Sequence, residues 1–193
     1  MGGAVTIRRA ERRDAAELAI LVDLSSHGLA SWLWYGAVLD GTTQTALEHG
    51  RNQMRHDDER AGWKDASLAE VDSEIAGIVI GHLVDPSFAD EVAPHPVFEP
   101  ILALQKQVVG NWFIDSVGVY RHHRGRGIGR HLVAHELSRA AGRAVSLITE
   151  SDNEVALGLY GSHGFEEIAR QPSVSTDTYS KKHDWVLLTR SAT

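Results

Sequence analysis

A strand that runs into a turn rich in glycine and arginine is the part of this sequence best suited to chemistry. The turn extends from Arg124 to Arg130 and follows Val117-Gly118-Val119. Glycine lets the backbone approach a ligand closely, and the first turn of a helix offers free N–H groups with a partial positive charge. Arginine adds bidentate donors for phosphate oxygens. The sequence therefore predicts an anion-binding cradle that suits a pyrophosphate group.

The predicted ligand-binding residues are the strand end and the whole turn: Val117, Gly118, Val119, Arg124, Gly125, Arg126, Gly127, Ile128, Gly129 and Arg130. Two common nucleotide-binding patterns do not fit. A Walker A loop needs a Lys-Ser/Thr pair after its glycines, and none follows here. The dinucleotide fingerprint that starts at Gly125 would need glycine at its sixth position, which is Arg130.

A second block supports a specific interpretation of the first. Asn153, Ala156 and Tyr160 share one face of a predicted helix, and Gly164-Phe165 follows. This block resembles the Asn-x-x-Ala-x-x-Leu-Tyr-x-x-x-Gly-Phe segment of the GNAT superfamily of N-acetyltransferases. The turn, read as Arg-x-x-Gly-x-Gly, resembles the acyl-CoA pyrophosphate loop of the same superfamily. The two blocks also occur in the order that the superfamily has.

The resemblance implies one α/β domain over residues 1–193, with a mixed central sheet, flanking helices and strands splayed at the acyl-CoA site. It implies transfer of an acyl group, usually acetyl, from acetyl-CoA to an amine that attacks the thioester directly. Tyr160 matches the general acid that protonates the leaving thiolate. Asn153 and Ala156 match residues beside the pantetheine arm, and Asn153 also suits a helix N-cap. The backbone of Val119 matches the group that bonds the pantetheine amide, and its N–H or that of a neighbour matches the group that polarises the thioester.

The general base departs from the superfamily pattern. Several members carry a carboxylate six residues before the Val119 position, where this sequence has Phe113. Asp115 lies on the same face of the strand, because side-chain direction repeats every two residues. Asp115 is therefore the candidate base, or a residue that binds substrate without taking a proton.

An aromatic cluster and a proline-rich insertion are candidates for the acceptor site. Trp32, Trp34 and Tyr35 lie where the superfamily places a wall of this site, although core packing is the alternative for tryptophan. The insertion, at about residues 85–110, is predicted to be mostly loop, because it holds four prolines. Long loops of this kind often border functional sites.

Histidine pairs raise the question of a metal. His131 and His135 are four residues apart on a predicted helix, but no third ligand is evident from the sequence. His122-His123 precede the turn and are interpreted as exposed loop residues or as contacts to the CoA phosphates. The sequence therefore predicts no metal site.

Hydrophobic periodicity predicts seven strands and five helices. The expected strands cover residues 5–9, 66–71, 75–84, 112–120, 145–149, 165–170 and 185–189. The first expected helix begins after Asp14, and the other four cover residues 43–56, 101–109, 127–142 and 153–163. Asp14 is predicted to cap the first helix in a capping box with Glu17. Both faces of residues 75–84 are apolar, so this strand should be central in the sheet and joined to 66–71 by a hairpin.

Composition excludes several classes of protein. The net charge of −7 argues against a nucleic-acid partner, which needs a basic surface. The absence of cysteine excludes a thiol nucleophile and disulfides. Neither a signal peptide nor a membrane span is evident, so a cytoplasmic protein is expected.

The sequence thus predicts an N-acetyltransferase that uses acetyl-CoA and acts on a primary amine, with a small molecule favoured over a protein. The alternative is a regulatory or interaction module that binds CoA without catalysis. Dimers are common in the superfamily, so a homodimer stays open.

Overall fold

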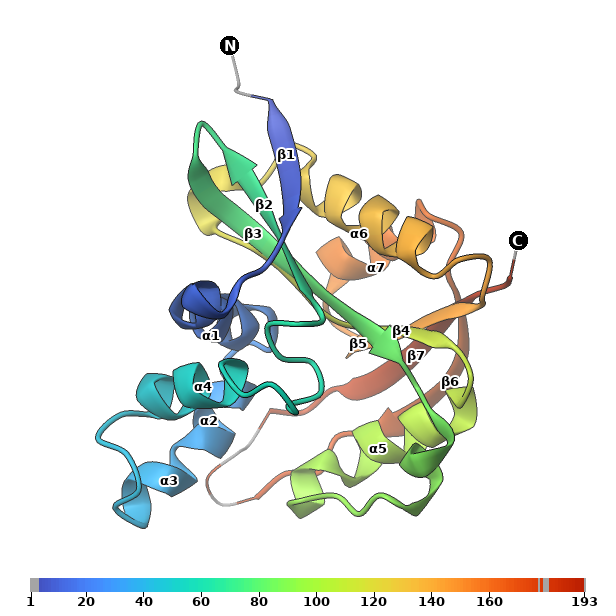
Figure 1. The fold of residues 1–193 in the computed structure, drawn as a ribbon. Helices are drawn as coiled ribbons and strands as arrows, with labels where there is room; N and C mark the ends of the chain where they lie inside the picture. The colour runs from blue at the N-terminus through green and yellow to red at the C-terminus, as the bar shows by residue number, and fades with distance from the viewer. Residues whose placement is uncertain (1–3, 177, 179–180, 193) are drawn as a thin grey trace. The chain divides into compact units, whose positions relative to one another are not determined.

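Alternating apolar residues build a mixed sheet in the computed structural model, which describes residues 4–176, 178 and 181–192. Among these residues the strands follow the hydrogen-bonded order β1-β2-β3-β4-β5-β7-β6 (Figure 1). Their bounds are β1 Val5–Arg9, β2 Ala66–Val71, β3 Glu74–Leu83, β4 Trp112–Val119, β5 Val145–Glu150, β6 Glu166–Pro172 and β7 Asp184–Arg190. The seven predicted strands are confirmed to within two residues at each end.

The α-helices are α1 Ala15–Ser25, α2 Leu29–Trp34, α3 Gly36–Leu39, α4 Ala46–Met54, α5 Glu99–Gln105, α6 Ile128–Arg139 and α7 Glu154–Gly161. Sequence periodicity identified five of them. It missed α2 and α3, which are too short to show a helical repeat. In the part of the chain that the structure describes, no helix has both the length and the apolar character needed to cross a membrane.

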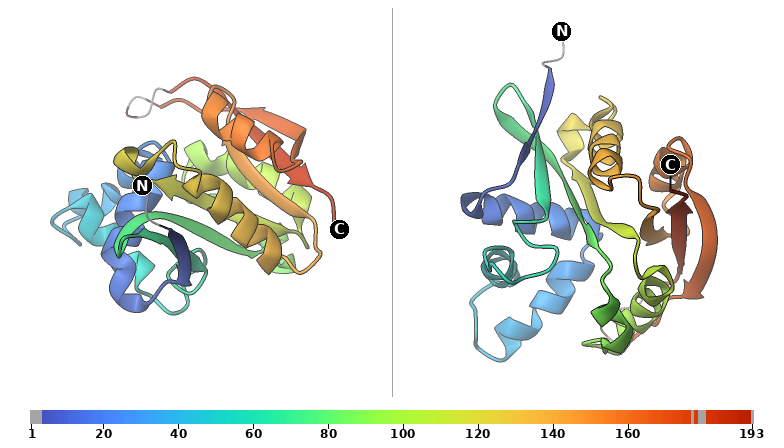
Figure 2. Two further views of the ribbon diagram at one scale, coloured as in Figure 1. Left: turned by 90° about the horizontal axis from the view of Figure 1, so that it is seen from above. Right: turned by 45° about the vertical axis from the view of Figure 1, so that its right-hand side comes forward.

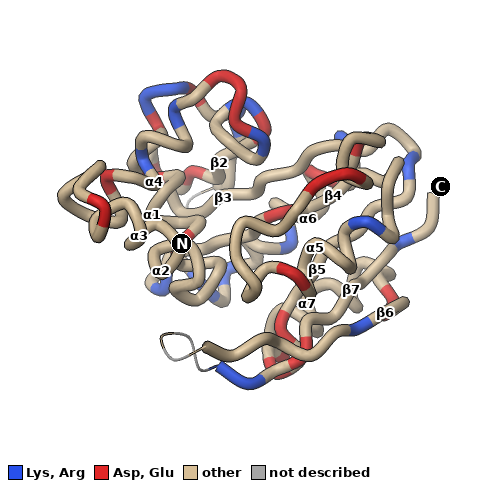
Figure 3. The backbone as a smooth tube through the Cα atoms, turned by 90° about the horizontal axis from the view of Figure 1, so that it is seen from below, with Lys and Arg blue, Asp and Glu red and all other residues tan. Residues whose placement is uncertain are grey.

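The chain forms two compact units, Met1–His82 with Asp115–Glu136 and Leu83–Ile114 with Leu137–Thr193. They are called unit 1 and unit 2 below, and each is described by itself. Strand β4 and helix α6 each contribute residues to both units. Acidic and basic positions are found in both units (Figure 3).

In unit 1 the antiparallel strands β1, β2 and β3 form a ribbon that is visible from two sides in Figure 2. The predicted hairpin between β2 and β3 is confirmed. Its turn residues Asp72 and Ser73 have φ angles of 52° and 68°, the left-handed pair that a tight turn between twisted strands requires. Residues 76–82 of β3 are all buried, as expected for a central strand.

Helices cover both faces of this ribbon. On one face Leu68 and Ile78 belong to a core cluster with Leu18 and Leu21 of α1. Ser67, which precedes Leu68 in β2, points the other way, and its hydroxyl lies 3.1 Å from Nε2 of His135 on α6. Alternation along one strand thus fixes α1 and α6 on opposite sides.

Two glycines let the backbones of β3, β4 and α1 approach closely. A Cβ atom at Gly118 would lie 2.7 Å from the carbonyl oxygen of Leu21, and one at Gly77 would lie 2.5 Å from the carbonyl oxygen of Gly118. Both distances are far below van der Waals contact. The packing of α1 is therefore the observed reason for glycine at position 118.

In unit 2, β5 and β6 flank β7 in antiparallel pairing, and β4 pairs with β5 in parallel from Trp112↔Val145 onward. Helix α5 packs on this part of the sheet. The proline-rich insertion, predicted to be mostly loop, contains the short 3-10 helices Pro86–Asp90 and Pro96–Phe98 before α5.

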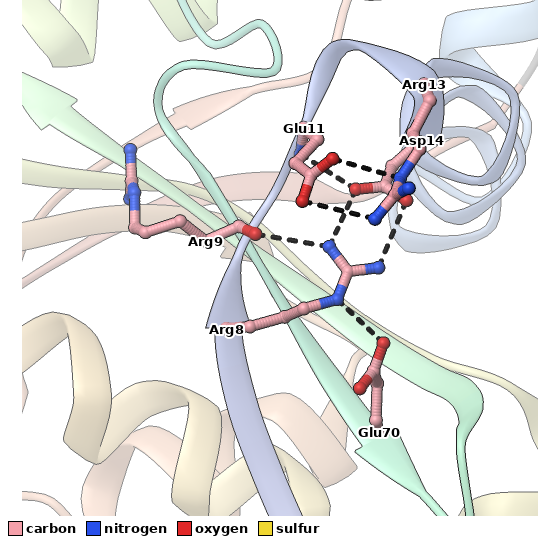
Figure 4. A network of polar contacts seen from close by, with 6 residues as sticks. All are labelled: Arg8, Arg9, Glu11, Arg13, Asp14 and Glu70. Atoms are coloured by element: carbon pink, nitrogen blue, oxygen red, sulfur yellow. Dashed lines mark hydrogen bonds and ion pairs between the residues drawn. The ribbon is translucent and has the colours of Figure 1, made fainter.

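The predicted capping box at the start of α1 is wrong. The carboxylate of Asp14 bonds backward instead, to the N–H of Glu11 at 2.7 Å, and it accepts hydrogen bonds from Arg8 (Figure 4). Arg8 also donates to Glu70 at 2.7 Å. This charged network joins the end of β1 to β2 and to the entry of α1, and a bidentate arginine partner outcompetes a local cap.

We expect Gly118→Ala to lower the free energy of unfolding by about 1–3 kcal/mol, because a methyl group must displace the backbone of α1. Urea unfolding measures the change. Gly158→Ala is the matched control, since nothing lies within 4 Å of a Cβ added at this exposed helical position. The control should gain about 0.5–1 kcal/mol. Equal effects of the two substitutions would contradict the packing argument.

We expect Asp14→Asn to lower the free energy of unfolding by about 1–2 kcal/mol at pH 7, because Arg8 loses one of its two charged partners. The hydrogen bonds from Arg8 lower the pKa of Asp14. The carboxylate therefore stabilises the fold above its unfolded pKa of about 3.9, and this contribution is lost as the pH falls through the lower folded value. Urea unfolding between pH 7 and about 3 should show the difference between wild type and variant shrinking. The exposed Asp58→Asn variant is the control, and a difference independent of pH would refute the assignment.

Candidate functional site

The predicted turn between β4 and α6 has the open backbone that an anion site needs. After the 3-10 helix Arg121–His123, Gly125 and Gly127 adopt φ angles of 76° and 80°. Side chains other than glycine rarely adopt such angles. A Cβ added at either glycine meets no atom within 4 Å. The space above this turn is open to a ligand.

The first turn of α6 supplies the donors. The first hydrogen bond of the helix runs from the N–H of His131 to the carbonyl of Gly127 at 3.2 Å. The N–H groups of Ile128, Gly129 and Arg130 precede it, so they have no partner within the helix. The side chain of Ile128 is buried in the core and anchors the helix start. The backbone can therefore donate to phosphate oxygens at the positive end of the helix dipole.

The arginines of the turn are exposed, and two of them are held by polar contacts. Arg124 Nε donates to the carbonyl of Val119 at 3.0 Å. Arg126 Nη1 lies 3.0 Å from Nδ1 of His123. The strand end and the turn are thus tied together within unit 1.

A polar cluster next to the turn was missed by the sequence analysis. Glu74 at the start of β3 lies 3.2 Å from Nε2 of His122 and 3.4 Å from Nε2 of His123. The hydrogen bond to His122 lowers the pKa of the Glu74 carboxyl. The alternative that both histidines are exposed loop residues is wrong for His123, which is 4% exposed. Local sequence gave no signal for Glu74, which joins the histidines only through the β2–β3 hairpin.

Tyr120, which follows Val119, is also bonded to a residue that is distant in sequence. Tyr120 donates its hydroxyl hydrogen to a carboxylate oxygen of Glu17 on α1, at 2.5 Å. Burial, with the bond to Glu17, raises the pKa of Tyr120 above its usual range. The ring of Tyr120 stacks on that of His122, with centroids 5.9 Å apart.

The second predicted block lies in unit 2. Asn153 caps α7, because its side-chain oxygen accepts a hydrogen bond from the N–H of Ala156 at 3.2 Å. The N-cap alternative for Asn153 is therefore confirmed, and its contact with the cofactor arm stays a prediction. Ala156 is half-buried one turn further along.

Tyr160 lies at the end of α7 with its ring against Phe165, at a centroid distance of 5.9 Å. The side chain is 8% exposed. Burial raises the pKa of the Tyr160 hydroxyl above its usual range. The hydroxyl is therefore protonated at neutral pH, as a proton donor must be.

The two β4 residues considered for the general base differ in environment. Phe113 is buried in the core of unit 2. Asp115 is exposed in unit 1, and one of its carboxylate oxygens accepts a hydrogen bond from the Ser116 hydroxyl at 3.0 Å. An exposed carboxylate can accept a proton directly or through water.

The aromatic cluster divides between core and surface. Trp34 is 4% exposed and packs so closely on α4 that a Cβ at Gly50 would lie 2.4 Å from its ring. This packing supports the core alternative for Trp34. Trp32 is half-buried and Tyr35 is 52% exposed, so only these two can contribute to a surface wall.

Relatives of known sequence match part of the chain. It is 39% identical over 75 residues to an N-alpha-acetyltransferase, RimI, from Mycobacterium tuberculosis, a match that covers 37% of this chain and 48% of the relative. The chain therefore spans less than half of that relative's length. It spans 16% of a second curated relative, from Mycobacterium leprae.

Solved structures match nearly the whole fold. An N-acetyltransferase from Staphylococcus aureus superposes with a TM-score of 0.66 at 19% identity, covering 96% of this chain and all of the other. The structure of yncA from Salmonella typhimurium with its cofactor acetyl-CoA gives a TM-score of 0.56 at 19% identity, covering 97% and 94% of the two chains.

The sequence profile of the acetyltransferase (GNAT) family matches residues 31–165. This segment holds the glycine–arginine turn, α6 and α7. The match covers more than half of the chain, which therefore belongs to the GNAT acetyltransferase family.

Proposed function

We propose that this protein is an N-acetyltransferase that transfers the acetyl group of acetyl-CoA to a primary amine. One observation carries the proposal: an open turn with Gly125 and Gly127 in the left-handed region leads into the free N–H groups of α6. This arrangement suits a pyrophosphate. Family membership makes the pyrophosphate of CoA the expected ligand.

Each step of the transfer needs a defined group. Acetyl-CoA supplies the thioester. The acceptor nitrogen must be deprotonated, because an alkylammonium has a pKa of about 10.4, and Asp115 is the candidate for this proton. The N–C bond then forms while the backbone N–H at Val119 stabilises the charge on the thioester oxygen. When the C–S bond breaks, Tyr160 donates its proton to the sulfur, and the second proton that the nitrogen loses as the amide forms is returned to the tyrosinate through water.

The remaining site residues bind rather than react. Arg124, Arg126, Arg130 and the backbone of the turn hold the diphosphate. The family pattern assigns contacts with the pantetheine arm to Val117 and Gly118 of unit 1 and, separately, to Asn153 and Ala156 of unit 2. Trp32 and Tyr35 are the proposed contacts for the acceptor. A small-molecule amine is favoured. The match to an N-alpha-acetyltransferase makes a peptide α-amine the second acceptor to test.

A CoA-binding module without catalysis is the second candidate. The observation in its favour is Phe113, a buried apolar residue at the position where several family members have a carboxylate. Turnover on an amine panel separates the two candidates.

Calorimetric titration tests the cofactor. We expect saturable binding of acetyl-CoA and none of NAD. The Arg130→Gln variant should bind acetyl-CoA about tenfold more weakly, because a charged phosphate contact is lost, which corresponds to about 1.4 kcal/mol. The matched control is Arg51→Gln, which removes the same charge from the exposed face of α4. If folded protein does not bind acetyl-CoA, the proposed function is overturned.

Replacement of Tyr160 by phenylalanine tests the acid. We expect kcat to fall about 100-fold or more, while the ring keeps its contact with Phe165 and the Kd for acetyl-CoA changes little. Since burial raises the pKa of Tyr160, the wild-type pH profile of kcat should show no alkaline loss from this group below pH ~10. A thiol-release assay at several pH values measures both. A variant that keeps more than half of the wild-type kcat would remove Tyr160 from the proton transfer.

A further inference from the structure

We propose that Glu74, His122 and His123 form a site for a zinc-type divalent cation beside the glycine–arginine turn. The three side chains offer one ligand atom each, and these atoms lie within 4.8 Å of one another. Two imidazoles and one carboxylate form a donor set that binds zinc in preference to magnesium or calcium. Neither the proposed acetyl transfer nor family membership accounts for this cluster.

The distances suit tetrahedral coordination. Zinc–ligand bonds of about 2.0–2.2 Å at tetrahedral angles place neighbouring ligand atoms about 3.3–3.6 Å apart. The two oxygens of the Glu74 carboxylate face different rings: Oε1 lies 3.2 Å from Nε2 of His122, and Oε2 lies 3.4 Å from Nε2 of His123. A small rotation of this carboxylate would present one oxygen, together with the two Nε2 atoms, to one ion. The fourth position would then be open to water.

The buried member of the cluster lacks a suitable partner. Nε2 of His123 is buried and has no hydrogen-bond partner among the described residues, although it lies 3.4 Å from Oε2 of Glu74. Glu74 and His122 lie above it, with side chains 62% exposed. The site thus has one buried ligand, His123, and two exposed ligands, Glu74 and His122, that an ion can reach from solvent.

Neighbouring residues orient the ligands. The ring of His122 stacks on Tyr120, and the hydroxyl of Tyr120 is held by Glu17. Such supporting contacts fix a ligand before the ion arrives and strengthen metal sites.

The contact between Arg126 and His123 makes the inference specific. A guanidinium can only donate hydrogen bonds, so Nδ1 of His123 accepts from Arg126, and the proton of the neutral ring is on Nε2. A metal ion on Nε2 displaces that proton, and a neutral ring must then carry it on Nδ1. The Nδ1–H group would face the donor of Arg126. Metal binding and the Arg126–His123 contact therefore exclude each other.

Because of this exclusion, we expect some substitutions to lower the affinity for Zn²⁺ and one to raise it. The Glu74→Gln and His122→Asn variants each lose one exposed ligand and should bind Zn²⁺ at least tenfold more weakly than wild type. Arg126→Gln should bind Zn²⁺ several-fold more tightly, because a glutamine oxygen can accept the new Nδ1–H bond. Arg130→Gln removes an equal charge from the turn without touching His123, so it controls for the loss of a positive charge.

The experiment is a titration of the purified full chain with Zn²⁺ against a chromophoric chelator, with Mg²⁺ as the comparison ion. His131→Asn is the control for histidine content, because His131 is exposed on α6 outside the cluster. We expect one Zn²⁺ per chain for wild type and for His131→Asn. Titration with Co²⁺ should add the visible absorption of a coordinated ion, and this absorption should be lost in Glu74→Gln.

Two results would overturn the proposal. One is no saturable Zn²⁺ binding below about 100 μM. The other is binding that Glu74→Gln and His122→Asn leave unchanged, which would assign the ion to other histidines. Both results are obtained without acetyl-CoA in the titration, so a failure here is distinct from a failure of the proposed function.

Discussion

The close approach of α1 to β4 is the constraint on which the rest of unit 1 depends. The carbonyl of Leu21 lies where a side chain at residue 118 would begin, and the carbonyl of Gly118 fills the corresponding space at Gly77. Three backbone segments therefore meet without intervening side chains. Val119 and Tyr120 follow at once, and Tyr120 is tied back to the same helix through Glu17. The position of the glycine–arginine turn is set by this contact, because the turn begins only a few residues later.

Much of this fold could be predicted from the sequence, because its strands are short and strongly patterned. Residues 75–84 are apolar on both faces, and the resulting β3 is central. The errors arise where a distant partner outcompetes a local one. Asp14 has the sequence of an N-cap, but the guanidinium of Arg8 on β1 binds its carboxylate instead. Helix α6 also buries Glu136, which an apolar pattern cannot identify.

The candidate site also contains local features that could be predicted and long-range ones that could not. The turn and the cap at Asn153 are formed by residues close together in sequence, and both were predictable. Glu74 and His122 are 48 residues apart in sequence. They meet only because the hairpin at Asp72-Ser73 starts β3 beside the 3-10 helix that precedes the turn. Neither hydrophobic periodicity nor residue spacing in the sequence predicts a contact between Glu74 and His122. The burial of His123 has the same origin, since it depends on what the fold brings over the ring.

Arg126 connects the two proposed binding sites of unit 1. Its guanidinium donates to Nδ1 of His123. A phosphate in the turn would compete for the same donor, and it would win, because a charge-assisted bond to a phosphate is stronger than one to a neutral imidazole. Once the guanidinium of Arg126 has left His123, Nδ1 can carry a proton. The ring is then in the tautomer that a metal on Nε2 needs. Occupation of the turn by an anion and of the cluster by a cation would therefore favour each other through one side chain. By reciprocity, each ligand would raise the affinity for the other by the same factor.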